Sequence, residues 1–135
     1  MGYFKNVEEA REYFKNDRFA TENGIVIDEL GEDYSVLSLK ITERHRNAVG
    51  GVMGGAIFTL ADLAFSAAAN NLHFPSVALQ SSINFLSGVK GDRLTARAEC
   101  KKNGMSTTIF NIDITDNTGR DIAQVVITGF KLRKE

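Results

Sequence analysis

Cysteine, proline and tryptophan are nearly missing from this sequence, which has one cysteine, one proline and no tryptophan. A single thiol excludes an internal disulfide and a cysteine-rich metal site. We expect Cys100 to pack as a small apolar side chain, because it falls on the apolar side of an alternating strand. The two histidines, His45 and His73, have no suitably spaced carboxylates and are expected in solvated connections. No metal site is therefore predicted.

An excess of charge of one sign and a long apolar run are missing too. Lys plus Arg total 16 and Asp plus Glu total 17, a formal net charge of −1, and the basic residues are spread along the chain. Nucleic acid or an anionic membrane would need a basic patch, so neither is an expected partner. The longest apolar-biased run, residues 54–69, contains Asp62 and is too short and polar to span a bilayer. Because the N-terminus has no apolar signal core, we expect a cytoplasmic protein.

The 135 residues are predicted to form a single domain, 1–135, with no linker or repeat. Asn6, with Glu9 at the capping-box position, predicts a short helix over about 7–16. A segment that is apolar nearly all round predicts a long, buried central helix over about 54–71. Alternating apolar residues predict strands at about 24–30 and 34–41 before this helix, and at about 77–85, 94–101, 110–115 and 121–132 after it.

The order of these elements defines the fold class. Strands joined by short hairpins form an antiparallel sheet, and the one long helix must cover its inner face, which makes an α+β domain. A single helix leaves the strand edges and the outer sheet face uncovered. Oligomerisation is the usual remedy for such edges.

A narrow polar seam runs along the predicted long helix. At 3.6 residues per turn its members fall within a band about 80° wide; they are Gly55, Thr59, Asp62, Ser66 and Asn70. The seam could face water, although the helix has neither the Lys nor the Glu typical of a solvent face. Asp62 could instead accept hydrogen bonds from a partner chain. A half-buried Asp62 would have a raised pKa, which suits a general base.

Gly54 and Gly55 open the same helix. The first N–H groups of a helix have no internal partners, and the helix dipole favours negative charge there. Two glycines would let a carbonyl oxygen approach this backbone closely, so that the site could stabilise an oxyanion. Alternatively, the glycines permit only a tight turn or close packing of a strand on the helix.

The run NAVGGVMGGAIFTLAD at residues 47–62 resembles the motif of the PaaI-like acyl-CoA thioesterases of the hotdog superfamily. The strand INFL at 83–86, followed by Gly91 and Asp92, is similar to the family's next strand and turn. This resemblance implies a hotdog fold, an antiparallel sheet of five to six strands wrapped around one long central helix. It implies hydrolysis of an acyl-CoA thioester, with coenzyme A as part of the substrate and no other cofactor. It also implies a homodimer, with dimers pairing into a homotetramer.

The resemblance assigns roles residue by residue. Asp62 would be the general base or the nucleophile, the Gly54 N–H would polarise the thioester carbonyl, and Asn47 would position the thioester or the attacking water. The family builds this site between two subunits. The residues expected to contact substrate are Met53, Gly55, Ser66, Ala78, Gln80 and Ser81.

Two positions depart from the family pattern. Met53 stands where the family commonly has His, and methionine cannot donate an imidazole hydrogen bond. Ala78 stands where many relatives have Ser or Thr. Both departures favour one alternative, a non-catalytic hotdog protein that binds acyl-CoA or another apolar ligand. A dehydratase is the weakest alternative, because its His-Phe-Pro signature would precede the central helix, whereas His73-Phe74-Pro75 follows it.

Overall fold

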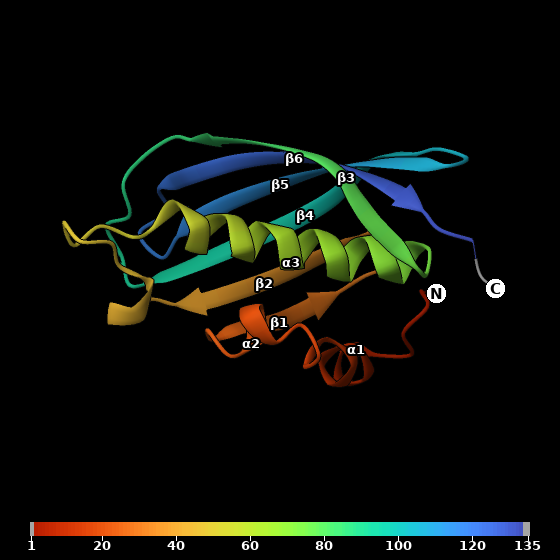
Figure 1. Ribbon diagram of the computed structural model, residues 1–135, viewed down its shortest axis with the longest axis horizontal. Helices are drawn as coiled ribbons and strands as arrows, with labels where there is room; N and C mark the ends of the chain where they lie inside the picture. Colours follow the sequence, from red (N-terminus) through yellow and green to blue (C-terminus); the bar gives the residue numbers. More distant parts are fainter. Residues whose placement is uncertain (1, 134–135) are drawn as a thin grey trace.

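Six strands form one antiparallel sheet that curves around a single long helix (Figure 1). The computed structural model describes residues 2–133. The strands are β1 (Ile25–Leu30), β2 (Tyr34–Lys40), β3 (Ser76–Phe85), β4 (Arg93–Asn103), β5 (Thr107–Asp116) and β6 (Asp121–Lys131). They lie in the order β1-β2-β4-β5-β6-β3, so β1 and β3 are the two sheet edges. The predicted α+β arrangement is confirmed.

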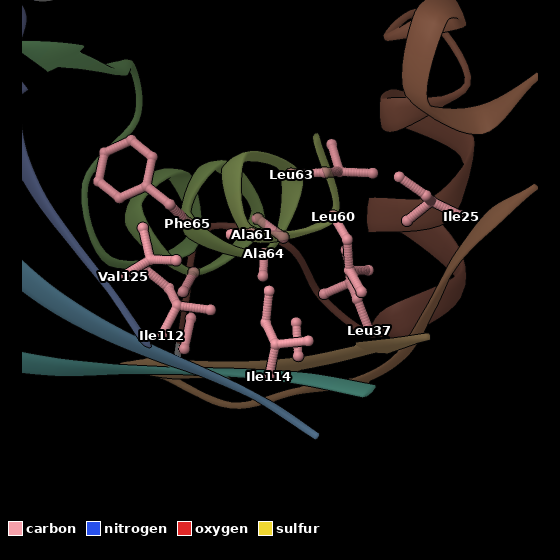
Figure 2. Packing of buried hydrophobic residues seen from close by; sticks show 14 of the residues in the cluster. Ile25, Leu37, Leu60, Ala61, Leu63, Ala64, Phe65, Ile112, Ile114 and Val125 are labelled. Carbon is pink, nitrogen blue, oxygen red and sulfur yellow. The ribbon is translucent and has the colours of Figure 1, made fainter. Parts of the chain in front are cut away.

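Helix α3 (Gly54–Leu72) crosses the concave face of the sheet, and its packing forms the core. Figure 2 shows Leu60 above Leu37, Ala64 above Ile114, and Phe65 beside Val125. Five alanines of α3 are buried and let the helix backbone lie close to the strands: Ala61, Ala64, Ala67, Ala68 and Ala69. A buried Leu or Phe side chain stabilises the fold by about 1.5–3 kcal/mol, so this face holds α3 in place and thereby positions the seam.

The N-terminal segment adds two short helices below the sheet. Helix α1 (Val7–Phe14) begins at the predicted cap, where the Asn6 side chain accepts a hydrogen bond from the Glu9 N–H at 2.9 Å, and it ends earlier than predicted. Arg11 donates from Nε to the Ile27 carbonyl at 2.8 Å, which ties α1 to edge strand β1. A second helix, α2 (Arg18–Thr21), was not predicted, because four residues are too few to give a periodic signal.

Strand β3 is the open edge of the sheet. Val77, Leu79 and Phe85 are all exposed large apolar side chains on this strand. An uncovered edge with apolar side chains is a template for pairing with another chain. The edge at β1 differs, because α1 lies beside it (Figure 1).

The side-chain alternation predicted for β3 is wrong at one point. A bulge between Ala78 and Gln80 shifts the register of pairing with β6. Ile83 pairs with buried Val125 and faces α3, whereas Val77 pairs with Phe130 on the outer face. An extra residue in one strand reverses the faces beyond it, which a strict two-residue period cannot anticipate.

Cys100 lies on β4 opposite buried Phe110 and is itself half-buried. Burial raises the pKa of its thiol above the ordinary value. Both observations fit the predicted packing role. Among residues 2–133, no helix is long and apolar enough to cross a membrane, and no group of three or more His, Cys, Asp or Glu side chains is placed to hold a metal ion.

Asp116 organises the turn between β5 and β6. Its Oδ2 accepts hydrogen bonds from the Lys90 and Gly91 N–H groups at 2.8 and 3.1 Å, and its Oδ1 accepts three more. Those three donors are the Thr118 hydroxyl, the Thr118 N–H and the Arg120 N–H. The Thr118 hydroxyl and the backbone donors hold the pKa of this carboxyl well below its usual range.

We expect Asp116→Asn to lower the thermal midpoint by about 5–10 °C, because an amide places its NH₂ against these donors. A depressed carboxyl pKa contributes stability above the ordinary aspartate pKa of about 3.9, and this is lost as pH falls below it. The difference between parent and variant should therefore be largest at neutral pH and shrink below about pH 4. Calorimetry as a function of pH measures it, with Asp113→Asn as the matched exposed control; equal shifts for both variants would contradict the assignment.

Candidate active site

The polar seam of α3 divides into a structural half and a free carboxylate. Asn70 donates from Nδ2 to the Ser66 carbonyl at 2.8 Å and accepts the Ser76 N–H at 2.8 Å, which ties the helix to the start of β3. Thr59 donates its hydroxyl to the Gly55 carbonyl at 2.7 Å. Asp62 makes no hydrogen bond or ion pair with any residue in the described part of the chain. Within the described residues, this carboxylate therefore has no structural role in hydrogen bonding.

Asp62 lines a cavity of about 320 Å³ between α2 and α3. The side chain remains solvent-exposed at this opening. Partial burial among the surrounding atoms nevertheless raises the pKa of its carboxyl, and the neighbouring Asp17 carboxylate raises it further. Arg18 also lines the cavity, but it pairs with Glu22. A carboxylate with a raised pKa and a free lone pair has the properties of a general base.

The N-terminus of α3 presents unpaired backbone donors. Within residues 2–133, the Gly54 and Gly55 N–H groups have no acceptor, and the cap residue Met53 supplies none from its side chain. A Cβ added at Gly54 would lie 3.0 Å from the Phe85 ring, so this glycine also lets the end of β3 approach the helix. Both interpretations of the glycine pair are therefore compatible with the geometry.

The loop before α3 is organised by Asn47. Its Oδ1 accepts hydrogen bonds from the Val49 and Gly51 N–H groups, both at 3.1 Å, and Gly50 adopts a φ of +91°. This bonding fixes the loop that precedes the helix terminus. At its tip, Val49 is 92% exposed, which is unusual for an apolar residue in so ordered a loop. The predicted role of Asn47 toward substrate stays a prediction.

One chain does not bring the predicted catalytic residues together. Gly54 and Asp62 lie eight residues apart on a straight helix, which corresponds to about 12 Å of rise. They also line different cavities: Gly54 lines one of about 630 Å³ beside Phe85 and Leu86. Met53 and Gly55 line a third cavity, of about 340 Å³. Within one chain, Gly54 and Asp62 therefore do not face the same cavity.

The predicted residues of β3 separate onto two faces. Ala78 and Ser81 pair with Gly129 and Ile127, on the face toward α3. Gln80 pairs with Thr128 and lies on the outer face, away from Ser66 and the rest of the seam. Gln80 and Ser81 face opposite sides because they are consecutive in the strand, and the bulge between Ala78 and Gln80 places Ala78 on the face of Ser81.

His45 corrects another expectation. Instead of a solvated loop, it occupies a buried position at the end of the short 3-10 helix Glu43–His45. Its Nε2 contacts the Asn23 carbonyl at 2.6 Å, and its Nδ1 accepts the Thr42 N–H at 3.0 Å. Its backbone carbonyl accepts the Met53 N–H at 2.8 Å, next to the helix start. Sequence reasoning missed it because flanking charges suggested a surface loop.

Comparison with known proteins connects this arrangement to a family. The model of the thioesterase superfamily matches residues 49–123. The acyl-coenzyme A thioesterase PaaI of Escherichia coli (strain K12) is 32% identical over 117 residues, which cover 86% of this chain and 84% of that protein. The chain belongs to the thioesterase superfamily. The predicted PaaI-like membership is confirmed, and with it the enzyme class, a thioester hydrolase.

Solved structures agree with this thioesterase at the level of the whole fold. The E. coli PaaI protein from the phenylacetic acid degradation operon superposes with a TM-score of 0.86 at 30% identity, covering 92% of this chain and 91% of that one. A hypothetical thioesterase protein from Streptococcus pneumoniae TIGR4, solved with coenzyme A, has a TM-score of 0.82 at 29% identity, covering 90% of this chain and 98% of that one. The predicted hotdog fold is confirmed, here with six strands.

Proposed function

We propose that this thioesterase hydrolyses an acyl-coenzyme A thioester to the free acid and coenzyme A, in a site shared by two copies of the chain. The observation that carries the proposal is Asp62, the one charged residue of α3, whose carboxylate has a raised pKa and no hydrogen-bond or ion-pair partner among residues 2–133. The similarity to PaaI and to a relative solved with coenzyme A supports the choice of substrate.

The chemistry assigns one task to each end of the site. Asp62 takes a proton from water as the water oxygen attacks the thioester carbonyl carbon. The carbonyl oxygen becomes an oxyanion that accepts hydrogen bonds from the Gly54 N–H and the α3 terminus of the other copy. The C–S bond then breaks, and the coenzyme A thiolate receives the proton held by Asp62. Direct attack by Asp62 would instead form an anhydride, which water then opens. Asn47 positions the thioester or the water, and no cofactor beyond the substrate's own coenzyme A takes part.

The shared site follows from the separation of Gly54 and Asp62 and from the open edge at β3. Antiparallel pairing of β3 with its copy would cover the exposed Val77, Leu79 and Phe85 and continue the sheet into the second chain. Phe85 already contacts Gly54 in the chain, so this pairing brings a partner close to the α3 terminus. Pairing of two such dimers into a homotetramer and a cytoplasmic location remain predictions.

Release of free thiol from a panel of acyl-CoA thioesters tests the proposal. We expect hydrolysis of at least one thioester by the parent protein. A parent that binds these thioesters in calorimetry but hydrolyses none would support the alternative, a binding protein without catalysis.

Mixed dimers test whether the site is shared. Asp62→Asn chains retain Gly54. Gly54→Val chains retain Asp62, but the added side chain would collide with the Phe85 ring beside the helix terminus. Each variant alone should be inactive, whereas co-refolded chains should recover about a quarter of parental activity, because half the dimers hold one intact site. No recovery, with mixed dimers verified by mass spectrometry, would place both residues in a site of one chain.

A further inference from the structure

Phe19 is a large apolar side chain left 76% exposed on α2. It lines the Asp62 cavity and also the separate cavity of about 340 Å³, so it stands at the boundary between the two. Single apolar side chains are common on protein surfaces and indicate nothing by themselves. An exposed aromatic ring that lines two adjoining cavities is a candidate for contact with a ligand. Phe19 also lies outside residues 49–123, the part that the family model matches.

The second cavity is suited to an apolar group. Ile25, Leu39, Ala56 and Phe58 form its walls, from β1, β2 and α3. The side chains of Arg44 and His45, which line it, already have hydrogen-bond partners: Arg44 donates to the Glu22 carbonyl at 2.9 Å, and both ring nitrogens of His45 are bonded. A pocket whose polar groups are already satisfied offers a ligand contact area but little hydrogen bonding.

The two cavities meet at shared residues. Phe58 and Thr59 line both, together with Phe19. Thr59 is three residues before Asp62, about 4.5 Å along the helix, so a carbonyl at Asp62 lies within one turn of the apolar cavity. The Thr59 hydroxyl donates to the Gly55 carbonyl, so Thr59 offers its methyl group at the boundary between the two cavities. A thioester at Asp62 can thus extend its acyl group beneath Phe19.

Hydrogen bonds fix the backbone around Phe19. The Phe19 carbonyl accepts a hydrogen bond from Asn23 Nδ2 at 2.6 Å, and the Glu22 carbonyl, just after α2, accepts one from Arg44 Nη1 at 2.9 Å. These hydrogen bonds fix the backbone that carries the Phe19 ring, although α2 is only four residues long.

We propose that the cavity beneath Phe19 and Phe58 binds the acyl group, and that Phe19 limits its size, so that this thioesterase selects compact acyl groups. This inference rests on the proposed function. A volume of about 340 Å³ lies at the low end of the range of about 300–1,000 Å³ for small-molecule sites. A short or branched chain or a single ring fits within such a space, whereas a longer chain has to extend past the Phe19 ring at its boundary.

Two substitutions at Phe19 test the inference. Phe19→Ala opens the cavity and Phe19→Trp narrows it, and both are expected to fold because the side chain is exposed. The ratio of kcat/KM for dodecanoyl-CoA to that for butanoyl-CoA should rise at least about tenfold in Phe19→Ala and fall in Phe19→Trp. Met105→Ala, at an exposed hairpin tip, is the control and should leave the ratio unchanged. Equal factors at all chain lengths in both Phe19 variants would overturn the inference.

A binding measurement separates this inference from the proposed function. S-alkyl coenzyme A thioethers cannot be hydrolysed, and calorimetry reports their affinity whether or not the protein catalyses. A parent that hydrolyses no thioester but shows the Phe19-dependent order of thioether affinities would refute the catalysis and support the acyl cavity. If the parent hydrolyses thioesters but the thioether affinities are the same in the parent and the Phe19 variants, the catalysis stands and the acyl cavity is refuted. If there is neither hydrolysis nor an effect of Phe19 on affinity, both proposals are refuted.

Discussion

Replacing Asp62 with asparagine is expected to lower kcat by about 10²–10⁴-fold, the usual contribution of a positioned general base. The amide has nearly the same shape but cannot accept a proton. No hydrogen bond or ion pair of Asp62 within the described residues is lost, so the melting temperature should not fall. Thiol release under saturating thioester, with calorimetry as the check on folding, measures the effect. A variant with parental kcat would remove Asp62 from the mechanism.

Asp17→Asn is the matched control, because it changes the neighbouring carboxyl in the same cavity. Asp62 must be ionised to act as a base, so activity should rise with pH through its pKa. The Asp17 charge raises that pKa, and its removal should lower it. The acidic limb of the pH–rate profile should therefore move to lower pH, with no loss like that of Asp62→Asn. An unchanged limb would mean that Asp62 is not the group that titrates.

Lysines on the open edge are expected to abolish both dimerisation and activity. Ser82 and Asn84 lie on the outer face of β3, paired with Val126 and Gln124, and both are exposed. In the double variant Ser82→Lys/Asn84→Lys, two antiparallel copies of β3 would place like charges near one another, which destabilises pairing. Each chain would then keep Asp62 without a partner's helix terminus, and activity should fall at least about 10²-fold.

The conservative pair Ser82→Thr/Asn84→Thr is the control, since it changes the same positions without charge and suits a strand. Light scattering gives the oligomeric state, and thiol release gives the activity. High salt should partly restore dimers of the lysine variant by screening the charges. A monomer with full activity would contradict the shared site, and an inactive dimer would place the defect elsewhere than in assembly.

The sequence was most informative where a periodic pattern was long. The 19-residue helix α3 and the strands were visible because apolar residues recur at the period of each element. The short helix α2 and the bulge in β3 were missed, because four residues and one inserted residue leave no period. The predicted environment of His45 was wrong for a related reason. This buried side chain is bonded by Thr42 and by Asn23, and Asn23 is remote in sequence.

The candidate site shows the same division. Asn47, Gly54 and Asp62 could be chosen from the sequence. The helix start and the helix period, which depend on residues close together in the chain, pointed to Gly54 and Asp62, and the family motif covers all three within residues 47–62. The tertiary structure alone decided that Asp62 has no hydrogen-bond or ion-pair partner among residues 2–133, that the start of α2 brings Asp17 beside it, and that Gly54 faces a different cavity. Local sequence determines which backbone conformation is favourable, whereas desolvation and charge interactions depend on what distant segments bring into contact. For this protein the sequence by itself determined the family, the fold class and the helix that carries Asp62. Only the packing of α2 and β3 around that helix decided the direction of the carboxylate's pKa shift, the apolar cavity beneath Phe19 and which edge of the sheet stays open.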